Sequence, residues 1–337
     1  MEQRVLGKTG RPVSIVGLGT WQLGADWGLV SEADALAVLR TAVESGVTFF
    51  DTADVYGDGR SERIIGRFTA DIYARGVTVA TKMGRRVAQV PENYVLENFR
   101  AWTDRSRVNL GVDRLDLVQL HCPPAPVYST DAVYDALDTL VAEERIAAYG
   151  VSVETSAEAL AAIAHPAVAT VQIILNAFRR KPLDEVLPAA AAAGVGIIVR
   201  VPLASGLLSG RYTPETAFAA DDHRTYNRHG EAFDAGETFS GVDYAAGVRA
   251  AAEFAAIVAA PGAFAADPGT AVTTAQAALR WVTQQPGVTT VIPGARNPGQ
   301  ARQNAAAGLL PPLSDAALGQ IEDLYDRYFR ADIHARW

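Results

Sequence analysis

The sequence predicts an α/β protein folded as one (β/α)8 TIM barrel, with an N-terminal β-hairpin plug and extra C-terminal helices. Short apolar strands alternate with amphipathic helices along most of the 337 residues. Counting strand ends gives about eight, the number that closes a parallel barrel. Single barrels commonly have this length, so we expect residues 1–337 to form a single domain.

The first residues predict the hairpin. Residues 4–6 and 13–16 have the composition of strands, and the glycines of residues 7–10 supply the φ values that a tight turn needs. Residues 15–19 then continue as the first barrel strand. A capping-box pattern at Ser31 opens the first helix of the barrel.

The strand-then-helix unit recurs along the chain. The strands are rich in β-branched and aromatic residues, whereas the helices have apolar residues three or four positions apart. We expect the later strands at residues 48–50, 77–81, 115–120, 146–153, 170–176, 196–202 and 288–294. We expect helices beginning near Ser61 and Pro91, and over residues 131–144, 157–164, 185–193, 273–285 and 297–307.

A long loop breaks this alternation at residues 203–241, which are rich in Gly, Asp, Arg and His. A loop of this length at the catalytic end of a barrel is typical of a lid or a binding loop, and a solvated loop is the plain alternative. An extra helix over residues 244–258 follows it, and the chain ends in a tail at residues 328–337. The loop side chains that could contact a ligand are His223, Arg224, Tyr226, Arg228, His229 and Phe233.

Composition and charge exclude several classes of function. A net charge of −8 argues against a nucleic-acid partner, which needs clustered Lys and Arg. Cys122 is the only cysteine, so the chain can form no internal disulfide. His121 and Cys122 are neighbours but lack further evident ligands, so we expect no bound metal. The sequence has no apolar signal region or membrane-spanning run, so we expect a cytoplasmic protein without a membrane partner.

Four polar residues lie at or just after the ends of predicted strands: Asp51, Tyr56, Lys82 and His121. The catalytic side chains of a parallel barrel sit at the C-terminal ends of its strands. An unperturbed tyrosine has a pKa of about 10, and a nearby lysine ammonium would lower the pKa of Tyr56 towards neutrality. Asp51 would keep Lys82 charged, and His121 could orient a carbonyl group. Asp51 alone could simply cap a turn, but the four residues in this order predict a proton donor.

The sequence contains no P-loop, no Gly-x-Ser-x-Gly elbow and no His-Glu-x-x-His motif. A tyrosine acid without a metal or an evident nucleophile suits carbonyl reduction, in which a cofactor gives the hydride and the enzyme gives the proton.

Seven segments resemble the aldo-keto reductases over nearly the whole chain, nearer the bacterial and potassium-channel-β-like branches. They are residues 17–21, 51–56, 81–82, 120–121, 150–152, 202–210 and 292–296. Together and in this order they are highly specific. The resemblance implies a (β/α)8 barrel that binds NADP(H) without a Rossmann motif. It also implies that Tyr56 is the general acid or base, and that Asp51, Lys82 and His121 complete a catalytic tetrad.

The same resemblance implies which residues contact the cofactor and the substrate. The start of the last barrel helix would hold the adenosine end, where backbone N–H groups already favour an anion. We therefore expect NADPH to be preferred over NADH. The expected substrate contacts are Trp21, Tyr56 and His121. The expected cofactor contacts are Gly19, Thr20, Trp21, Asp51, Ser152, Gln172, Arg200, Leu203, Ser205, Gly206, Arg211, Gly294, Arg296, Gln300 and Asn304.

Two residues depart from the family pattern near the nicotinamide. Arg200 stands where the family usually has an aromatic residue, and Val153 stands where it usually has asparagine. Our hypothesis is that the planar guanidinium of Arg200 stacks on the nicotinamide ring or hydrogen-bonds to its carboxamide. Trp27 and Tyr128 are further aromatic candidates for the pocket, with simple packing as the alternative.

The sequence therefore predicts an NADP(H)-dependent oxidoreductase that interconverts an aldehyde or ketone and the alcohol. One alternative is an NADP-binding regulatory or sensor subunit with slow turnover, and another is a sugar or polyol dehydrogenase working in the oxidative direction. A cofactor-free barrel isomerase is disfavoured by the tetrad. The expected partner is a small-molecule carbonyl or alcohol, and a homo-oligomer is left open.

Overall fold

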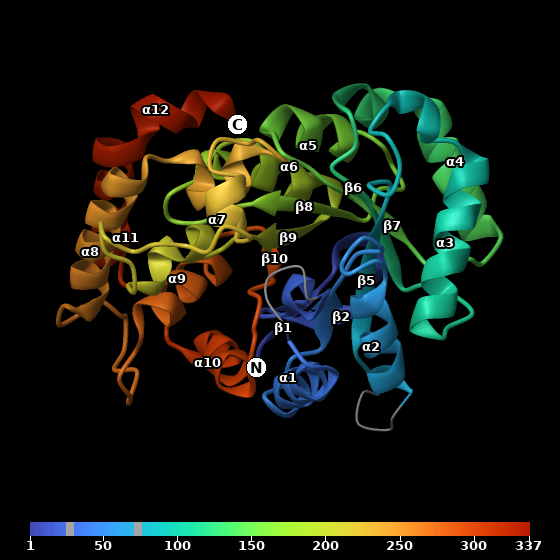
Figure 1. Cartoon of the computed structure of the whole chain (residues 1–337). Helices are drawn as coiled ribbons and strands as arrows, with labels where there is room; N and C mark the ends of the chain where they lie inside the picture. Colours follow the sequence, from blue (N-terminus) through green and yellow to red (C-terminus); the bar gives the residue numbers. More distant parts are fainter. Residues whose placement is uncertain (25–29, 71–75) are drawn as a thin grey trace.

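The computed structural model of the chain describes residues 1–24, 30–70 and 76–337, and it has the predicted barrel (Figure 1). Eight parallel strands pair in chain order. Parallel bridges from Val16 to Val291 and from Gly19 to Gly294 join the first strand to the last, so the barrel is nearly closed. The strands are β3 (Leu18–Gly19), β4 (Phe49–Asp51), β5 (Thr78–Met83), β6 (Leu117–His121), β7 (Tyr149–Ser152), β8 (Thr170–Ile174), β9 (Gly196–Arg200) and β10 (Val288–Val291).

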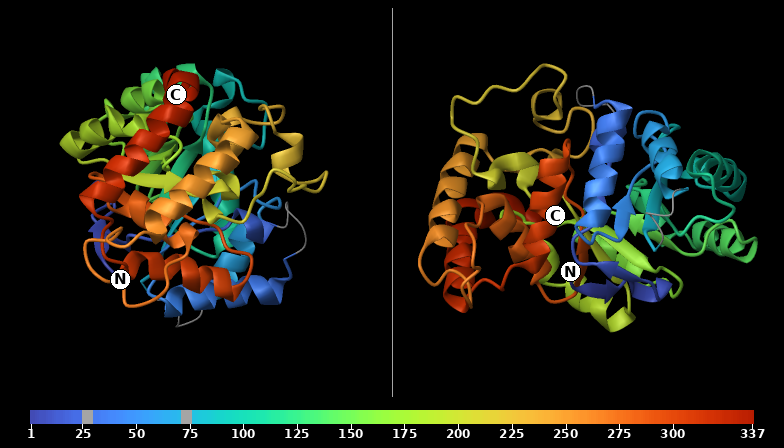
Figure 2. Two further views of the ribbon diagram at one scale, coloured as in Figure 1. Left: turned by 90° about the vertical axis from the view of Figure 1, so that its left-hand side faces the viewer. Right: turned by 90° about the horizontal axis from the view of Figure 1, so that it is seen from below.

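Helices surround these strands (Figures 1 and 2). Capping side chains begin several of them, including the helix for which the sequence predicted a cap at Ser31. The Ser31 hydroxyl accepts a hydrogen bond from the Asp34 amide, and Thr155 and Thr273 form complete capping boxes. The barrel helices are α1 (Glu32–Glu44), α2 (Arg60–Thr69), α3 (Leu96–Leu110), α4 (Asp131–Ala142), α5 (Ser156–Ile163), α6 (Val186–Ala193), α9 (Thr274–Thr283) and α10 (Pro298–Ala306).

A hairpin of β1 (Gln3–Val5) and β2 (Pro12–Ser14) covers the N-terminal end of the barrel. The Arg4 guanidinium donates to the carbonyl of Val288, where β10 begins, at 2.6 Å. Gly7 has a φ of +50°, and a Cβ there would lie 2.1 Å from the carbonyl oxygen of Ala169, so only glycine fits. Leu6 and Val13 of this segment join the buried cluster inside the barrel.

The long connection after β9 contains short helical turns. It holds the 3₁₀ turn η7 (Ala204–Ser209), the short helix α7 (His223–Tyr226), and the 3₁₀ turns η8 (Ala235–Glu237) and η9 (Phe239–Gly241). Helix α8 (Tyr244–Ala259) follows and packs against α11 (Asp315–Tyr325).

The end of the chain differs from the expected tail, because it continues as helix. After α11 the chain forms η11 (Asp326–Arg330), α12 (Ala331–Ile333) and η12 (His334–Arg336). Tyr325, Phe329 and Ile333 recur every four residues and are all buried, which gives the segment an apolar stripe. The indole of Trp337 is also buried and lies 3.9 Å from the guanidinium carbon of Arg179. The stripe holds the segment against the barrel.

Within residues 1–24, 30–70 and 76–337, the helices lack the combination of length and apolar character that crossing a bilayer would require. Trp27, one of the candidate pocket residues, lies outside the described residues.

Candidate active site

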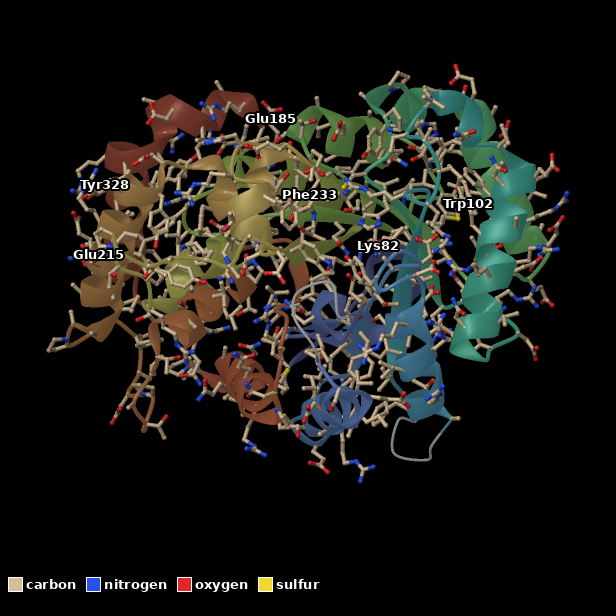
Figure 3. All side chains as sticks on the ribbon, viewed as in Figure 1. Lys82, Trp102, Glu185, Glu215, Phe233 and Tyr328 are labelled. Atoms are coloured by element: carbon tan, nitrogen blue, oxygen red, sulfur yellow. The ribbon has the colours of Figure 1, made fainter. Side chains whose placement is uncertain are left out.

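Asp51, Tyr56 and His121 open into one cavity of about 480 Å³ at the C-terminal rim of the barrel. Asp51 is the last residue of β4, His121 is the last residue of β6, and Tyr56 lies in the turn that leads to α2. Lys82, in β5, does not line the cavity and is 1% exposed; Figure 3 labels its position. Parallel strands of similar length end at one rim, and this places the four groups together.

The ammonium of Lys82 links Asp51 to Tyr56. Its Nζ donates to the Asp51 carboxylate, to the carbonyl of Thr52 at 2.9 Å, and to the Tyr56 hydroxyl at 3.4 Å. Burial pulls the pKa of Lys82 down, but the Asp51 carboxylate and Tyr56 outweigh it and leave the pKa above its usual value. Lys82 therefore stays charged beside the phenol.

Two buried glutamines hold Asp51 in place. Gln119 of β6 and Gln172 of β8 donate to Asp51 Oδ2 at 3.1 and 2.8 Å. Gln172 was expected to bind the cofactor, whereas Gln119 was not singled out from the sequence. Each carboxylate oxygen of Asp51 therefore has a fixed donor, which orients the ion pair with Lys82.

The pKa of Tyr56 corrects one expectation. Burial raises the pKa of this phenol, Lys82 lowers it, and the net result is a pKa above the usual value. The ammonium alone was expected to bring the pKa towards neutrality, but burial of the phenol is the larger effect here. Tyr56 is consequently a protonated phenol at neutral pH.

His121 is a neutral imidazole. Its pKa lies well below the usual value because of burial, and then because of Arg85, Lys82 and Arg200. Its ring meets that of Tyr56 edge-on, with centroids 6.0 Å apart. Among the described residues, Nδ1 has no hydrogen-bond partner although it is buried. A neutral imidazole can both donate and accept a hydrogen bond, which suits contact with a carbonyl or hydroxyl group.

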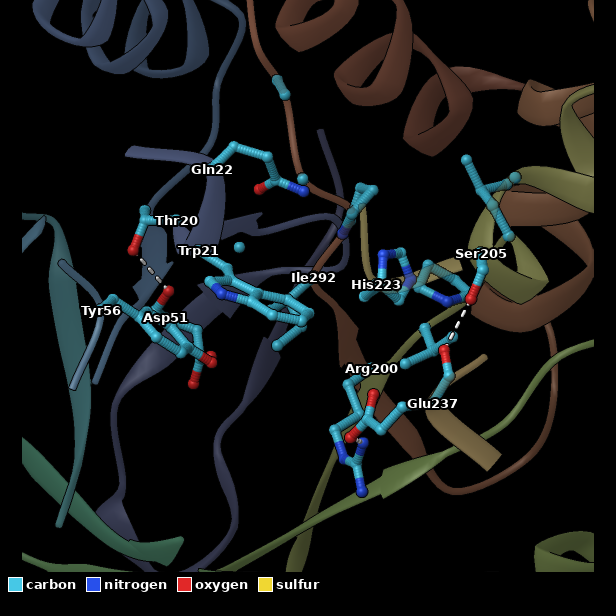
Figure 4. Close-up of a pocket in the computed structure, with 18 of the residues that line it drawn as sticks. Thr20, Trp21, Gln22, Asp51, Tyr56, Arg200, Ser205, His223, Glu237 and Ile292 are labelled. Carbon is cyan, nitrogen blue, oxygen red and sulfur yellow. Dashed lines mark hydrogen bonds and ion pairs between the residues drawn. The ribbon is translucent and has the colours of Figure 1, made fainter. Parts of the chain in front are cut away.

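Aromatic side chains form one wall of the cavity. Trp21 stacks beside Tyr56 with centroids 6.1 Å apart, and it lies 6.0 Å from Phe233 and 5.8 Å from His223. In Figure 4 the indole of Trp21 lies between Tyr56 and His223. Phe233 and His223 come from the long loop, so the loop completes this wall.

Most of the residues expected to contact a cofactor line the same cavity. Arg211 and Asn304 lie outside the lining. Asn304 donates to the carbonyl of Gly294 at 3.1 Å and so supports a residue that does line it. The lining members are Gly19, Thr20, Trp21, Asp51, Ser152, Gln172, Arg200, Leu203, Ser205, Gly206, Gly294, Arg296 and Gln300.

The turn η7 has an unusual backbone. Ala204, Ser205 and Gly206 have consecutive positive φ values of 48°, 54° and 98°, and Val201 just before them has 50°. Positive φ is costly for a β-branched residue, and such strain is concentrated at functional sites. A Cβ at Gly206 would lie 2.3 Å from the Tyr212 hydroxyl, so glycine keeps this part of the cavity open.

Arg200 is clamped between two carboxylates. Its Nη2 donates to Glu154 Oε2 and to the carbonyl of Val153, both at 2.9 Å, and its Nη1 pairs with Glu237 (Figure 4). Burial raises the pKa of Glu154, but Arg200 and Arg85 outweigh it and hold the pKa below its usual value. Arg200 is therefore a buried charge with its own counter-ions, a feature that the sequence hypothesis did not include.

The long loop reaches the cavity through some of its expected contact residues. His223, Arg224 and Phe233 line it, whereas Tyr226, Arg228 and His229 lie outside the lining. Burial lowers the pKa of His223 to about 4, so this imidazole is neutral at pH 7. The carbonyl of Glu237 accepts a hydrogen bond from Ser205 Oγ at 2.6 Å, which fastens the loop to η7.

Sequence reasoning missed Arg85, Gln119, Glu154 and Glu237. Arg85 and Glu154 each stand two residues after a barrel strand, so the rule that strand ends carry functional residues could have found them. Gln119 lies inside a strand, and an amide on an otherwise apolar strand was an available signal. Glu237 has no comparable signal, because its position depends on how the loop folds back.

Comparisons with known proteins show what the chain is similar to. Residues 15–326 match the model of the Aldo/keto reductase family. The chain is 28% identical over 304 residues to the aldo-keto reductase YhdN of Bacillus subtilis, covering 89% of this chain and 86% of that protein. It is 32% identical over 225 residues to L-galactose dehydrogenase of Arabidopsis thaliana, covering 64% and 69%. It is 27% identical over 343 residues to a probable voltage-gated potassium channel subunit beta of rice, covering 96% of each.

Solved structures have the same fold. A glycerol dehydrogenase from Gluconobacter oxydans superposes with a TM-score of 0.77 at 27% identity, covering 97% of this chain and 95% of the other. An aldo-keto reductase from Klebsiella pneumoniae in complex with NADPH superposes with a TM-score of 0.70 at 23% identity, covering 96% of each.

Proposed function

The chain belongs to the aldo/keto reductase family, and from that premise we propose that it is an NADP(H)-dependent oxidoreductase that interconverts an aldehyde or ketone with the corresponding alcohol. The observation that carries the proposal is the Tyr56 hydroxyl 3.4 Å from the Lys82 ammonium, with the neutral ring of His121 on the same cavity. This arrangement offers a proton donor whose conjugate base has a permanent counter-charge.

The cavity has the features that a nicotinamide dinucleotide needs. Asp51, Ser152 and Gln172 would hold the nicotinamide end, and the strained turn η7 would hold the pyrophosphate. The N-terminus of α10, with Arg296 and Gln300 beside it, would hold the adenosine end and its phosphate. NADPH, when bound, supplies hydride for reduction, and NADP⁺ takes hydride in the reverse direction.

Tyr56 would handle the proton. In reduction its hydroxyl gives a proton to the oxygen of the substrate carbonyl, while the carbonyl carbon gains the hydride. The phenolate that remains is stabilised by Lys82, whose own charge is held by Asp51. His121 would orient the carbonyl oxygen as a neutral hydrogen-bonding group. In oxidation the phenolate takes the proton of the alcohol.

For Arg200 we retain the stacking part of the hypothesis. The two carboxylates fix the plane of its guanidinium, so it could pack on the nicotinamide ring without reorganising. Substitution by tyrosine, the kind of residue usual in the family, should change both cofactor affinity and turnover. Unchanged values would rule out this role.

A second candidate function is an NADP-binding sensor subunit with slow turnover. It is favoured by the similarity to the potassium channel subunit beta, which extends over 96% of both chains. The names of two other similar proteins, a glycerol dehydrogenase and an L-galactose dehydrogenase, favour a polyol or sugar as the substrate of the oxidoreductase.

Cofactor titration and turnover test the proposal together. We would follow the binding of NADPH and NADH by fluorescence, and then measure oxidation of NADPH with a panel of aldehydes and ketones and reduction of NADP⁺ with polyols and sugars. We expect tighter binding of NADPH and turnover that Tyr56→Phe abolishes while cofactor binding is retained. Tight binding without turnover on any substrate would favour the sensor, and equal affinity for both cofactors would contradict the NADP(H) assignment.

A further inference from the structure

We propose that Arg85 selects a neutral, polyhydroxylated substrate by donating hydrogen bonds to its hydroxyl groups at the reacting end of the cavity. The inference rests on the proposed function, because it names the substrate class of the same site. It concerns a residue outside the tetrad and outside the expected cofactor contacts.

The first support is the position of Arg85. It follows β5 by two residues, and its Nε donates to the backbone carbonyl of His121 at 3.0 Å. This bond fixes the guanidinium at the end of β6, which is the residue His121. Arg85, His121 and Tyr56 line the same cavity. The Nη1 and Nη2 edge of a guanidinium carries four N–H donors, which leaves Arg85 with donors close to the reacting centre.

The second support is the balance of charge around Arg85. Its Nη2 lies 3.5 Å from Glu154 Oε1, but Glu154 also pairs with Arg200 at the shorter distance of 2.9 Å. Glu237 is the second counter-ion of Arg200. The two arginines and the two glutamates therefore cancel in formal charge.

The same balance holds for the other described ionisable groups at this end of the cavity. Asp51 is neutralised by Lys82, and Arg224, which lines the cavity next to His223, is neutralised by Asp222. His121 and His223 are both uncharged at neutral pH. A substrate carboxylate or phosphate would gain little from a region without net charge, and it would lie close to the glutamates. A hydroxyl group can use a guanidinium donor and a carboxylate acceptor at once, so hydroxyl groups fit this end better than an anion.

The third support is the aromatic wall of the same cavity. Trp21 presents a flat indole between Tyr56 and Phe233. Polyols and sugars carry C–H groups that pack on such a face and hydroxyl groups that need polar partners. A cavity with an aromatic wall and a fixed guanidinium provides both.

Matched aldehydes test the inference. Glyceraldehyde is propanal with two added hydroxyl groups, and succinic semialdehyde is butanal with its terminal methyl group replaced by a carboxylate. With saturating NADPH and concentrations corrected for the free carbonyl form, we expect the native protein to prefer glyceraldehyde over propanal. We do not expect it to prefer succinic semialdehyde over butanal.

Variants of two adjacent arginines supply the comparison. Arg85→Met should lower the ratio of kcat/KM for glyceraldehyde to kcat/KM for propanal by about 10- to 100-fold, the effect of losing a hydrogen bond from a charged donor. Arg85→Lys should lower the ratio less, because one donor and the charge remain. Arg86→Met is the control, because Arg86 pairs with Asp58 and lies outside the cavity lining. Arg86→Met should keep the native ratio of the two kcat/KM values. Unchanged affinity for NADPH shows that each variant is folded.

Three results would overturn the assignment of Arg85 while the proposed function stands. If Arg85→Met lowered kcat/KM equally for glyceraldehyde and propanal, Arg85 would only support His121. An unchanged ratio would mean that Arg85 does not contact the hydroxyl groups. A native preference for succinic semialdehyde that Arg85→Met removes would mean that Arg85 anchors an anion. Native protein that binds NADPH and turns over no aldehyde, polyol or sugar would instead remove the proposed function, and this inference with it.

Discussion

Tyr56 is buried deeply enough that its pKa rises even though an ammonium lies 3.4 Å from its hydroxyl. Lys82 limits this rise, and in the mechanism that we propose it would also stabilise the phenolate. A protonated Tyr56 fits the role of proton donor that we propose for reduction at neutral pH.

This protonation state predicts opposite pH profiles for the two directions. With the cofactor-bound enzyme, kcat/KM for reduction should stay level through about pH 9 and fall only above about pH 10 as the Tyr56 proton is lost, whereas oxidation should become faster as pH rises. Lys82→Met should move both transitions to higher pH, because the phenolate loses its counter-charge. Steady-state rates from about pH 6 to about pH 11 measure this. A reductive rate that already falls between about pH 6 and pH 7 would contradict it.

Asp54, between Asp51 and Tyr56 in the chain, is a second unusual residue. It is 1% exposed, and among the described residues neither of its carboxylate oxygens has a hydrogen-bond partner. Burial, and then repulsion from Glu62, raise the pKa of Asp54 from 3.8 to about 7, although Arg86 and Arg105 oppose the rise. Between these two pH values the folded protein keeps a proton that the unfolded chain has released. The contribution of Asp54 to stability therefore falls as pH rises from about 4 to about 7.

Replacement of Asp54 by asparagine should remove this dependence. Between about pH 5 and pH 8, native protein should lose about 2–3 kcal/mol of unfolding free energy that Asp54→Asn does not lose. Thermal unfolding at several pH values measures how the free energy of unfolding changes with pH in native protein and in Asp54→Asn. Asp221→Asn, at an exposed site in the long loop, should behave like native protein. Parallel slopes for native protein and Asp54→Asn would show that Asp54 does not carry the effect.

At the scale of elements, the buried Arg200 joins three segments. It ends β9, its partner Glu154 follows β7, and its partner Glu237 ends η8 in the long loop. The hydrogen bond from Ser205 to the carbonyl of Glu237 and another from Asn176 to Ser240 fasten the same loop. The loop is thus held against two strand ends by polar contacts as well as by Phe239 and other apolar residues.

The two sides of this cluster should respond unequally to substitution. Arg200→Met leaves Glu237 without its cation and leaves Glu154 with only the more distant Arg85, so it should destabilise the cofactor-free protein by about 3 kcal/mol. Glu237→Gln removes one of the two counter-ions of Arg200. It should lower the free energy of unfolding clearly less, because Glu154 remains. Thermal unfolding of both variants gives the comparison. If both variants lost the same free energy of unfolding, Glu237 would contribute as much as the whole cluster, and the prediction would be wrong.

At the scale of the whole molecule, one cavity runs from the tetrad to the N-terminus of α10, so cofactor binding should stabilise the entire barrel. At a concentration of about 100 times its dissociation constant, a ligand that binds only the folded state adds about 2.7 kcal/mol. Arg296, at the start of α10, lines the cavity at the end that would receive the adenosine phosphate.

This arrangement predicts a larger increase in Tm with NADPH than with equimolar NADH. Arg296→Gln should reduce the difference between the two cofactors, because the phosphate loses a charged donor. Arg302→Gln is the matched control, since Arg302 is exposed on the same helix and lies outside the cavity lining. Equal increases with both cofactors in native protein would contradict the preference for NADPH.

The sequence by itself determined the barrel and the positions of the tetrad. Strand and helix periodicities are local, and in a parallel barrel every strand ends at the same rim. Asp51, Lys82 and His121 at three strand ends therefore had to meet. The hairpin followed in the same way from the turn at residues 7–10, and the capping side chains fixed where several helices begin.

Only the tertiary structure decided how these groups are tuned. Gln119 and Gln172 converge on Asp51 from strands that are far apart in the chain, and Glu237 reaches Arg200 through a loop whose path no local pattern specifies. The direction in which the pKa of Tyr56 shifts depends on how completely the neighbouring segments exclude water. The end of the chain is helical because its apolar stripe finds a surface on which to pack. Local periodicity sets which atoms reach the rim, whereas burial and long-range contacts set their charge and their partners, because both depend on the packing of the whole chain.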